Sequence, residues 1–106
     1  MTNFVLLYSG GGSMSGTEAE QAAVLQAWTA WYSGLGSAVV DWGAPFSPAA
    51  KSVASDGTVA NGPVGALVSG YTIIKADSLD AAVQMGKSCP ILKAGGRISV
   101  YESLPM

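Results

Sequence analysis

The sequence predicts a small α+β fold, and three observations support this class. The chain has 106 residues, the usual size of one domain, so we expect residues 1–106 to fold as a single unit. Short apolar or alternating runs, typical of strands, are interrupted by two segments whose apolar residues recur at helical spacing. Hydrophobic residues make up 49% of the chain and charged residues only 11%, which favours a substantial core and leaves little charged surface.

The first half of the chain is predicted to run strand, helix, strand. Residues 3–9 form an apolar run that ends in three glycines, as expected for a buried strand followed by a loop. Thr17 and Glu20 have the spacing of a capping box, so a helix is expected over residues 18–33. The helical spacing places four apolar side chains on its buried face, namely Val24, Trp28, Trp31 and Leu35. Residues 37–42 are expected to form the second strand.

The second half is predicted to add a hairpin, a long strand, a helix and a last strand. The Asp-Gly pair at 56–57 suits a two-residue turn inside a small hairpin over residues 51–60. Residues 67–76 alternate, with Tyr71, Ile73 and Lys75 on one face and Thr72 and Ile74 on the other. Ser78 is expected to cap a helix whose buried stripe is Leu79, Ala82, Val83 and Gly86, and which ends before Pro90. Residues 97–102 alternate again and form the last strand.

This order is that of a ferredoxin-like βαββαβ sandwich with a small hairpin insertion. Both helices then cover the same face of the sheet, so the apolar side chains on the other face need a different cover. A second copy of the chain is the simplest cover, because closed two-fold dimers are the commonest oligomers. We therefore expect a homodimer whose two sheets form a dimeric α+β barrel.

Charge and composition exclude several classes of function. Five basic and seven acidic residues give a net charge of −2 without a basic cluster, so neither nucleic acid nor a membrane surface is an expected partner. The chain has no histidine and one cysteine, which argues against a transition-metal site and a disulfide. The expected function needs no tightly held cofactor. The apolar run at residues 4–8 is too short for a membrane span or a signal peptide, and the cytoplasm is the expected location.

Gly10-Gly11-Gly12 between a strand and a helix is an incomplete match to a dinucleotide-binding fingerprint. Ser15 occupies the third glycine position of that motif. Glu18 and Glu20 lie at the helix terminus that would have to attract phosphate, and their charge opposes it. A plain loop is the favoured interpretation.

Several short segments carry, in their order and spacing, a resemblance to a known family. They are FVLLY at 4–8, Trp28 to Trp31, AVVD at 38–41 with GAP at 43–45, GYTI at 70–73, ADSLDAA at 76–82, and Cys89-Pro90 with Gly95-Gly96. Over nearly the whole chain they resemble the YCII-related domain family, which is related to the DGPF-domain proteins. The resemblance implies a dimeric α+β barrel with a cleft between sheet and helices, in a family whose members mostly lack an assigned reaction.

The chain departs from this family at two points. Where the related branch has Asp-Gly-Pro-Phe, it has only Asn61-Gly62-Pro63-Val64. Family members often carry a histidine proposed to act with an aspartate, and no histidine is present here. The family's suspected catalysis is therefore not implied for this chain.

Asp41 is the candidate catalytic residue. It is the one carboxylate inside an apolar strand run, between Val40 and Trp42, where burial would make it a proton acceptor near neutral pH. The competing interpretation, which we favour, is a strand-end aspartate that accepts hydrogen bonds from backbone N–H groups of the loop at Gly43. Cys89, next to Pro90, is expected to be an inert core residue rather than a reactive thiol.

The aromatic residues are numerous enough to line a small-molecule pocket, with core packing as the competing role. They are Tyr8, Trp28, Trp31, Tyr32, Trp42 and Tyr71, of which Tyr8, Trp28, Trp31 and Tyr71 are the predicted ligand-binding residues. The first functional hypothesis is a dimer that binds a small apolar or aromatic metabolite in this cleft. The second is a cofactor-independent enzyme, an isomerase or oxygenase of the dimeric-barrel type, with Asp41 as base and Tyr8 or Tyr71 as hydrogen-bond donor. The third is a structural or regulatory partner protein without a ligand.

Overall fold

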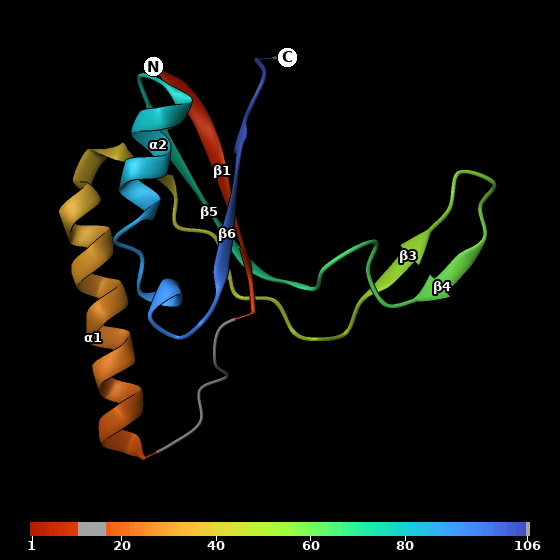
Figure 1. Cartoon of the computed structure of the whole chain (residues 1–106), viewed down its shortest axis with the longest axis horizontal. Helices are drawn as coiled ribbons and strands as arrows, with labels where there is room; N and C mark the ends of the chain where they lie inside the picture. The colour runs from red at the N-terminus through yellow and green to blue at the C-terminus, as the bar shows by residue number, and fades with distance from the viewer. Residues whose placement is uncertain (11–16, 106) are drawn as a thin grey trace.

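The computed structural model describes residues 1–10 and 17–105, and Figure 1 shows how their elements are arranged. In chain order these are β1 (Thr2–Ser9), α1 (Glu18–Leu35), the 3₁₀ turn η1 (Gly36–Ala38), β2 (Val39–Asp41), β3 (Lys51–Val53), β4 (Val59–Asn61), β5 (Val68–Ala76), α2 (Leu79–Gly86), the 3₁₀ turn η2 (Pro90–Leu92) and β6 (Arg97–Glu102). The predicted α+β class is confirmed, because the described residues form two α-helices, a four-stranded sheet and a two-stranded sheet. The segment from Gly11 to Ser15, weighed above as a nucleotide fingerprint, lies outside the described residues.

The main sheet is antiparallel, with the strand order β2-β5-β1-β6. Its centre is the long pair β1 and β5, whose register runs from Thr2 opposite Ala76 to Tyr8 opposite Gly70. β6 pairs with the other side of β1, and the short β2 pairs with β5. Residues far apart in sequence therefore meet across two central strands.

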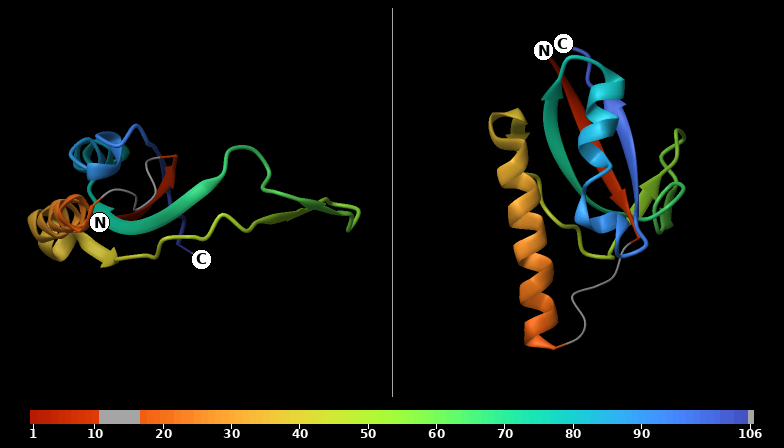
Figure 2. Two further views of the ribbon diagram at one scale, coloured as in Figure 1. Left: turned by 90° about the horizontal axis from the view of Figure 1, so that it is seen from below. Right: turned by 60° about the vertical axis from the view of Figure 1, so that its left-hand side comes forward.

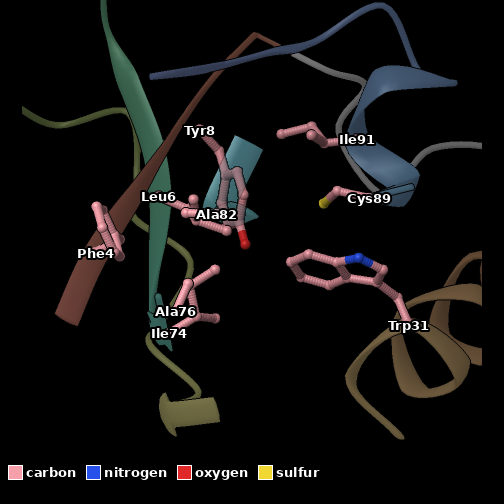
Figure 3. Close-up of a cluster of buried hydrophobic side chains, with 9 residues drawn as sticks. All are labelled: Phe4, Leu6, Tyr8, Trp31, Ile74, Ala76, Ala82, Cys89 and Ile91. Atoms are coloured by element: carbon pink, nitrogen blue, oxygen red, sulfur yellow. The ribbon is translucent and has the colours of Figure 1, made fainter. Parts of the chain in front are cut away.

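Both helices lie on one face of this sheet, as the two views in Figure 2 show. Side chains alternate along a strand, so every second residue of β1 and β5 points toward the helices. The buried cluster seen in Figure 3 consists of Phe4, Leu6, Tyr8, Trp31, Ile74, Ala76, Ala82, Cys89 and Ile91. Most of these residues come from the two central strands, so the core is a single layer between the sheet and the helices.

The opposite face of the sheet carries apolar side chains that the helices do not reach. We call it the outer face and define it by Val5, Leu7, Tyr71, Ile73 and Tyr101, which the strand register places side by side. Four of them are half-buried, and Tyr101 is 58% exposed. Phe46 extends this surface through a tilted ring contact with Tyr71, with 5.8 Å between ring centroids. The sheet thus has one covered apolar face and one open apolar face.

α1 differs from the predicted helix in length and in what it buries. Thr17 caps it as expected, since its hydroxyl accepts a hydrogen bond from the N–H of Glu20, but the helix continues past Ser33 to Leu35. Val24, predicted to be buried, is 43% exposed. The first half of α1 extends beyond the end of the sheet, so only the second half can pack on it (Figure 1).

α2 begins as predicted, with the Ser78 hydroxyl accepting a hydrogen bond from the N–H of Ala81. Its expected apolar stripe is only half buried: Ala82 and Gly86 are covered, whereas Leu79 and Val83 are exposed. Leu79 and Val83 instead line one wall of an open groove between α2 and β6. The prediction of a continuous buried stripe was wrong because α2 packs near the β6 edge of the sheet, where no further element covers it among the described residues.

The hairpin β3–β4 is present, but its turn differs from the predicted two-residue turn. Gly57 has the expected positive φ of 90°. Among the described residues only glycines have a positive φ, so Asp56 does not. Its N–H donates to the Ala54 carbonyl, and the Ala54 N–H donates to the Thr58 carbonyl. This pattern closes a three-residue loop, with Asp56 accepting from the N–H of Thr58.

The hairpin and its two connections, residues 46–67, form an arm that extends away from the sheet and both helices (Figures 1 and 2).

The strand predicted over residues 37–42 is shorter than expected, since its first part is the η1 turn. Among the described residues, no helix has the length and hydrophobicity needed to cross a membrane.

Candidate functional site

Five aromatic side chains meet between α1, β1 and the end of β2, and we call them the aromatic cluster. They are Tyr8, Trp28, Trp31, Tyr32 and Trp42, linked in sequence by ring contacts of 4.6 to 5.8 Å between centroids. The edge-to-face contact of Tyr8 with Trp28, at 5.4 Å, joins the sheet to the helix. Three of the four predicted ligand-binding residues, Tyr8, Trp28 and Trp31, therefore do lie together.

The cluster has a closed side and an open side. Tyr8 and Trp31 are only 4% and 7% exposed, so they act as core residues. Trp28 and Tyr32 are half-buried, and Trp42 is 57% exposed. The aromatic rings accessible from outside are thus those of Trp28, Tyr32 and Trp42.

A hydrogen-bond network centred on Thr72 holds the cluster to the sheet. Tyr8 Oη donates to Thr72 Oγ1 at 2.7 Å, and Thr72 Oγ1 donates to the carbonyl oxygen of Trp42 at 3.2 Å. Tyr32 Oη lies within hydrogen-bonding distance of Thr72 Oγ1, at 3.1 Å, and of the Trp42 carbonyl oxygen, at 3.2 Å. Thr72 is fully buried and its bond with Tyr8 is shielded from water, whereas the bonds to Tyr32 and Trp42 lie nearer the surface. The network joins β1, β5, α1 and the end of β2.

The two indole nitrogens of α1 differ in their partners. Trp31 Nε1 donates to the Met85 carbonyl and to Ser88 Oγ, both at 3.1 Å, which ties α1 to the end of α2. In the described part of the chain, Trp28 Nε1 has no hydrogen-bond partner, and it is not among the buried polar atoms. Among the described residues, Trp28 therefore keeps an unpaired N–H donor on a half-buried ring.

Cys89 lies under the cluster beside Tyr8 and Trp31, as Figure 3 shows. Burial disfavours the thiolate and raises the pKa of Cys89 to about 11. Burial likewise raises the pKa of Tyr8 above its ordinary value. Both groups stay protonated near neutral pH, which agrees with the expectation that Cys89 is an inert core thiol.

Asp41 and Tyr71 lie on the outer face, on the other side of the sheet from the aromatic cluster. Asp41 Oδ1 accepts from the backbone N–H of Gly43 at 2.9 Å, as expected for a strand-end aspartate. Its other oxygen, Oδ2, accepts from Tyr71 Oη at 3.3 Å. The negative charge of Asp41 raises the pKa of Tyr71. Asp41 is exposed rather than enclosed by Val40 and Trp42, and Tyr71 shares no pocket with Tyr8, Trp28 and Trp31.

Gly43 is needed for this turn after β2. Its φ is +78°, and a Cβ at this position would lie 1.7 Å from the Tyr71 carbonyl oxygen. Only glycine allows the backbone to approach β5 so closely, and this approach also brings the Trp42 carbonyl to Thr72.

Two surface grooves lie away from the aromatic cluster. One, of about 330 Å³, is lined by apolar side chains of α2 and β6, with Lys87 at its edge. The other, of about 170 Å³, lies near the N-terminus and η1. No group of three or more potential metal-ligating side chains occurs among residues 1–10 and 17–105.

Thr72 is the residue of this site that the sequence interpretation did not identify. The available signal was a polar side chain at an inward position of β5, next in the same alternation to Ile74 and Ala76. A buried hydroxyl in such a position must have hydrogen-bond partners, and those partners mark the site.

Removing the Thr72 hydroxyl is expected to destabilise the fold more than its size implies. Thr72→Val leaves the buried Tyr8 hydroxyl without its acceptor, at a cost of about 1–3 kcal/mol in the free energy of unfolding. Tyr8→Phe should cost about 1 kcal/mol, because Thr72 keeps the Trp42 carbonyl as acceptor. In urea unfolding at one fixed protein concentration, the double variant should lose less than the sum of the two single variants. Strict additivity would contradict this account of the network.

No known protein family and no curated protein matched the chain in sequence comparisons. The similarity to the YCII-related family therefore stays a prediction from the residues quoted above.

Proposed function

We propose that the chain is one subunit of a homodimeric, YCII-related small-molecule-binding protein with a ferredoxin-like subunit fold. The strand order β2-β5-β1-β6 supports this fold, as do the helices that follow the first and third sheet strands in sequence. The observation that carries the dimer is the open outer face of the sheet. Contiguous apolar surface of this kind marks an interface more often than a solvated surface.

The exposed area of the chain supports the same conclusion. A compact monomer of 10.7 kDa exposes about 5,500 Å². This chain exposes 7121 Å², an excess of about 1,600 Å². If each of two copies buried that excess, the interface would total about 3,200 Å², which falls within the range of obligate homodimers. Pairing two outer faces would join the two sheets into the proposed dimeric α+β barrel.

The ligand is proposed to bind at the open side of the aromatic cluster. Trp28, Tyr32 and Trp42 offer accessible ring surface there, and Trp28 Nε1 offers a donor without a partner in the described residues. Apolar walls with few polar groups are typical of small-molecule sites. A small aromatic molecule with one hydrogen-bond acceptor fits this combination.

A second candidate function is a cofactor-independent enzyme that uses Asp41 as base. The hydrogen bond between Asp41 and Tyr71 favours it, because it joins a carboxylate and a phenol on the outer face. A carboxylate paired with a hydroxyl donor can take a proton from a substrate while the donor stabilises the developing charge. In the proposed dimer this pair would face the space between the two sheets.

Leu7→Glu is expected to dissociate the dimer. Leu7 lies opposite Tyr71 and Ser99 at the centre of the outer face, so the substitution places a charge in the proposed interface. Size-exclusion chromatography with light scattering should then give a monomer, with circular dichroism unchanged. Leu25→Glu, at a leucine that is 58% exposed on α1, is the matched control and should stay dimeric. A Leu7→Glu protein with the parent's dimer affinity would contradict the proposal.

Trp28→Phe is expected to weaken ligand binding while keeping an aromatic ring. The probes are aromatic compounds with a carbonyl or ring-nitrogen acceptor, titrated against intrinsic tryptophan fluorescence. Loss of one hydrogen bond should reduce their affinity about two- to tenfold. Tyr101→Phe, on the outer face, is the control and should bind like the parent. If no compound binds, or if Trp28→Phe binds with unchanged affinity, the cluster is not the ligand site.

Asp41→Asn separates the two candidate functions. The amide oxygen can still accept from Gly43, so the melting temperature should stay within a few degrees of the parent. Binding at the aromatic cluster should also survive, since Asp41 lies on the other face. If the protein is an enzyme that uses Asp41 as base, turnover of its substrate should fall about 10²- to 10⁴-fold. A parent-like rate would rule out the enzyme hypothesis in this form.

A further inference from the structure

The hairpin at the end of the arm, residues 46–67, lies away from the sheet and both helices of its own subunit. It projects as a two-stranded hairpin from one end of the sheet (Figure 1). The chain measures 44 × 40 × 18 Å, and its radius of gyration of 15.2 Å exceeds the value of about 13 Å expected for a compact domain of this length. An isolated two-stranded hairpin is at best marginally stable in water.

The composition of the arm does not suit a solvated extension. Only Lys51 and Asp56 are charged among residues 46–67. Five large apolar side chains are exposed on it, with Phe46 at 46%, Val53 at 66%, Val59 at 59%, Val64 at 86% and Leu67 at 43%. Val53 and Val59 are direct cross-strand partners, so they form one apolar spot on the hairpin. Strand pairs that face water usually carry charges or proline instead.

The base of the arm is joined to the outer face. Phe46 donates its N–H to the Ser69 carbonyl at 2.8 Å, and its ring contacts that of Tyr71. A bridge between Pro45 and Gly70 fixes the neighbouring backbone to β5. The base of the arm is therefore continuous with the face that we propose as the dimer interface, and the hairpin projects beyond it.

We propose that the arm embraces a second copy of this chain, with each subunit contributing its arm to the other. This inference rests on the proposed homodimer and adds the element that holds it together. In a two-fold dimer the two subunits make identical contacts. If one arm packs on the partner subunit, the partner's arm packs in the same way on the first subunit, so one kind of contact covers both arms. The excess exposed area of about 1,600 Å² per chain is more than the roughly 800 Å² that each partner contributes to an interface of standard size, which leaves area for the arms to bury.

Photocrosslinking from the arm tip tests this placement. Cys89 is buried with a raised pKa, so Ser55→Cys in the otherwise native chain adds one accessible thiol for a benzophenone maleimide. The parent chain is the labelling control. Equal amounts of ¹⁴N- and ¹⁵N-labelled protein are mixed, allowed to exchange subunits and irradiated. The expected result is crosslinked peptides that contain both isotopes, which can form only between two copies.

A paired substitution tests whether the arm contributes to affinity. Val53→Lys combined with Val59→Glu removes the apolar spot but keeps opposite charges across the strands, so the hairpin can still form. The dimer dissociation constant should rise at least about tenfold. Val24→Glu on α1, also at an exposed valine, is the control and should leave the constant unchanged.

The outcomes distinguish the arm from the dimer itself. A dimer that gives only single-isotope crosslinks, and whose affinity the paired substitution does not change, would overturn the arm proposal and leave the outer-face dimer standing. The exposed apolar side chains of the arm would then be available to a different protein. A parent protein that is monomeric would overturn both proposals at once.

Discussion

The constraint on which the rest of the structure depends is that two helices cover only one face of a four-stranded sheet. Alternation along β1 and β5 gives both faces apolar side chains, with Leu6 and Ile74 on one side and Leu7 and Ile73 on the other. The helices bury the first pair completely, and the second pair stays half-buried. In water this asymmetry leaves apolar area uncovered, and a second copy of the chain can cover it. The proposed barrel, the placement of Asp41 and the role of the arm all follow from this one-sided core.

Thr72 gives the covered side its specific geometry. Apolar packing alone would allow α1 to slide on the sheet, whereas the oxygens around Thr72 require fixed distances to Tyr8, Tyr32 and the Trp42 carbonyl. The positive φ of Gly43 and its close approach to Tyr71 bring that carbonyl into place. One side of the sheet therefore holds a polar network inside an aromatic cluster, while the other carries the hydrogen-bonded pair of the exposed Asp41 and the half-buried Tyr71.

Local patterns predicted most of the fold because they report local physics. The caps Thr17 and Ser78, the alternation in residues 67–76 and the last strand at Arg97–Glu102 were all predicted from residues within a few positions of each other. Periodicity could not tell that Val24 lies beyond the end of the sheet or that Leu79 and Val83 border a groove, since these depend on where neighbouring elements stop. The turn at Gly57 was predicted from its dipeptide but is one residue longer, because Asp56 keeps a negative φ and accepts from Thr58.

The candidate site was predictable only in part for the same reason. The aromatic residues of α1 were recognised from their spacing, and Asp41 was expected to accept from the loop at Gly43, which it does. Tyr71 was grouped with Tyr8, although the register places Tyr71 opposite Leu7 and on the other face of the sheet. Strand pairing decides such questions, and the pairing of β1 with β5 joins residues more than sixty positions apart. The role of Thr72 is not visible in local sequence because its hydrogen-bond partners belong to other elements.

Sedimentation equilibrium of the unmodified protein at micromolar concentration tests the central claim most directly, that the outer face is covered by a second copy. The account predicts a single species of about twice the 10.7 kDa chain mass, because a closed two-fold dimer covers both outer faces. A mass of 10.7 kDa across the concentration range would contradict it. The apolar outer face would then be exposed to water in the native state.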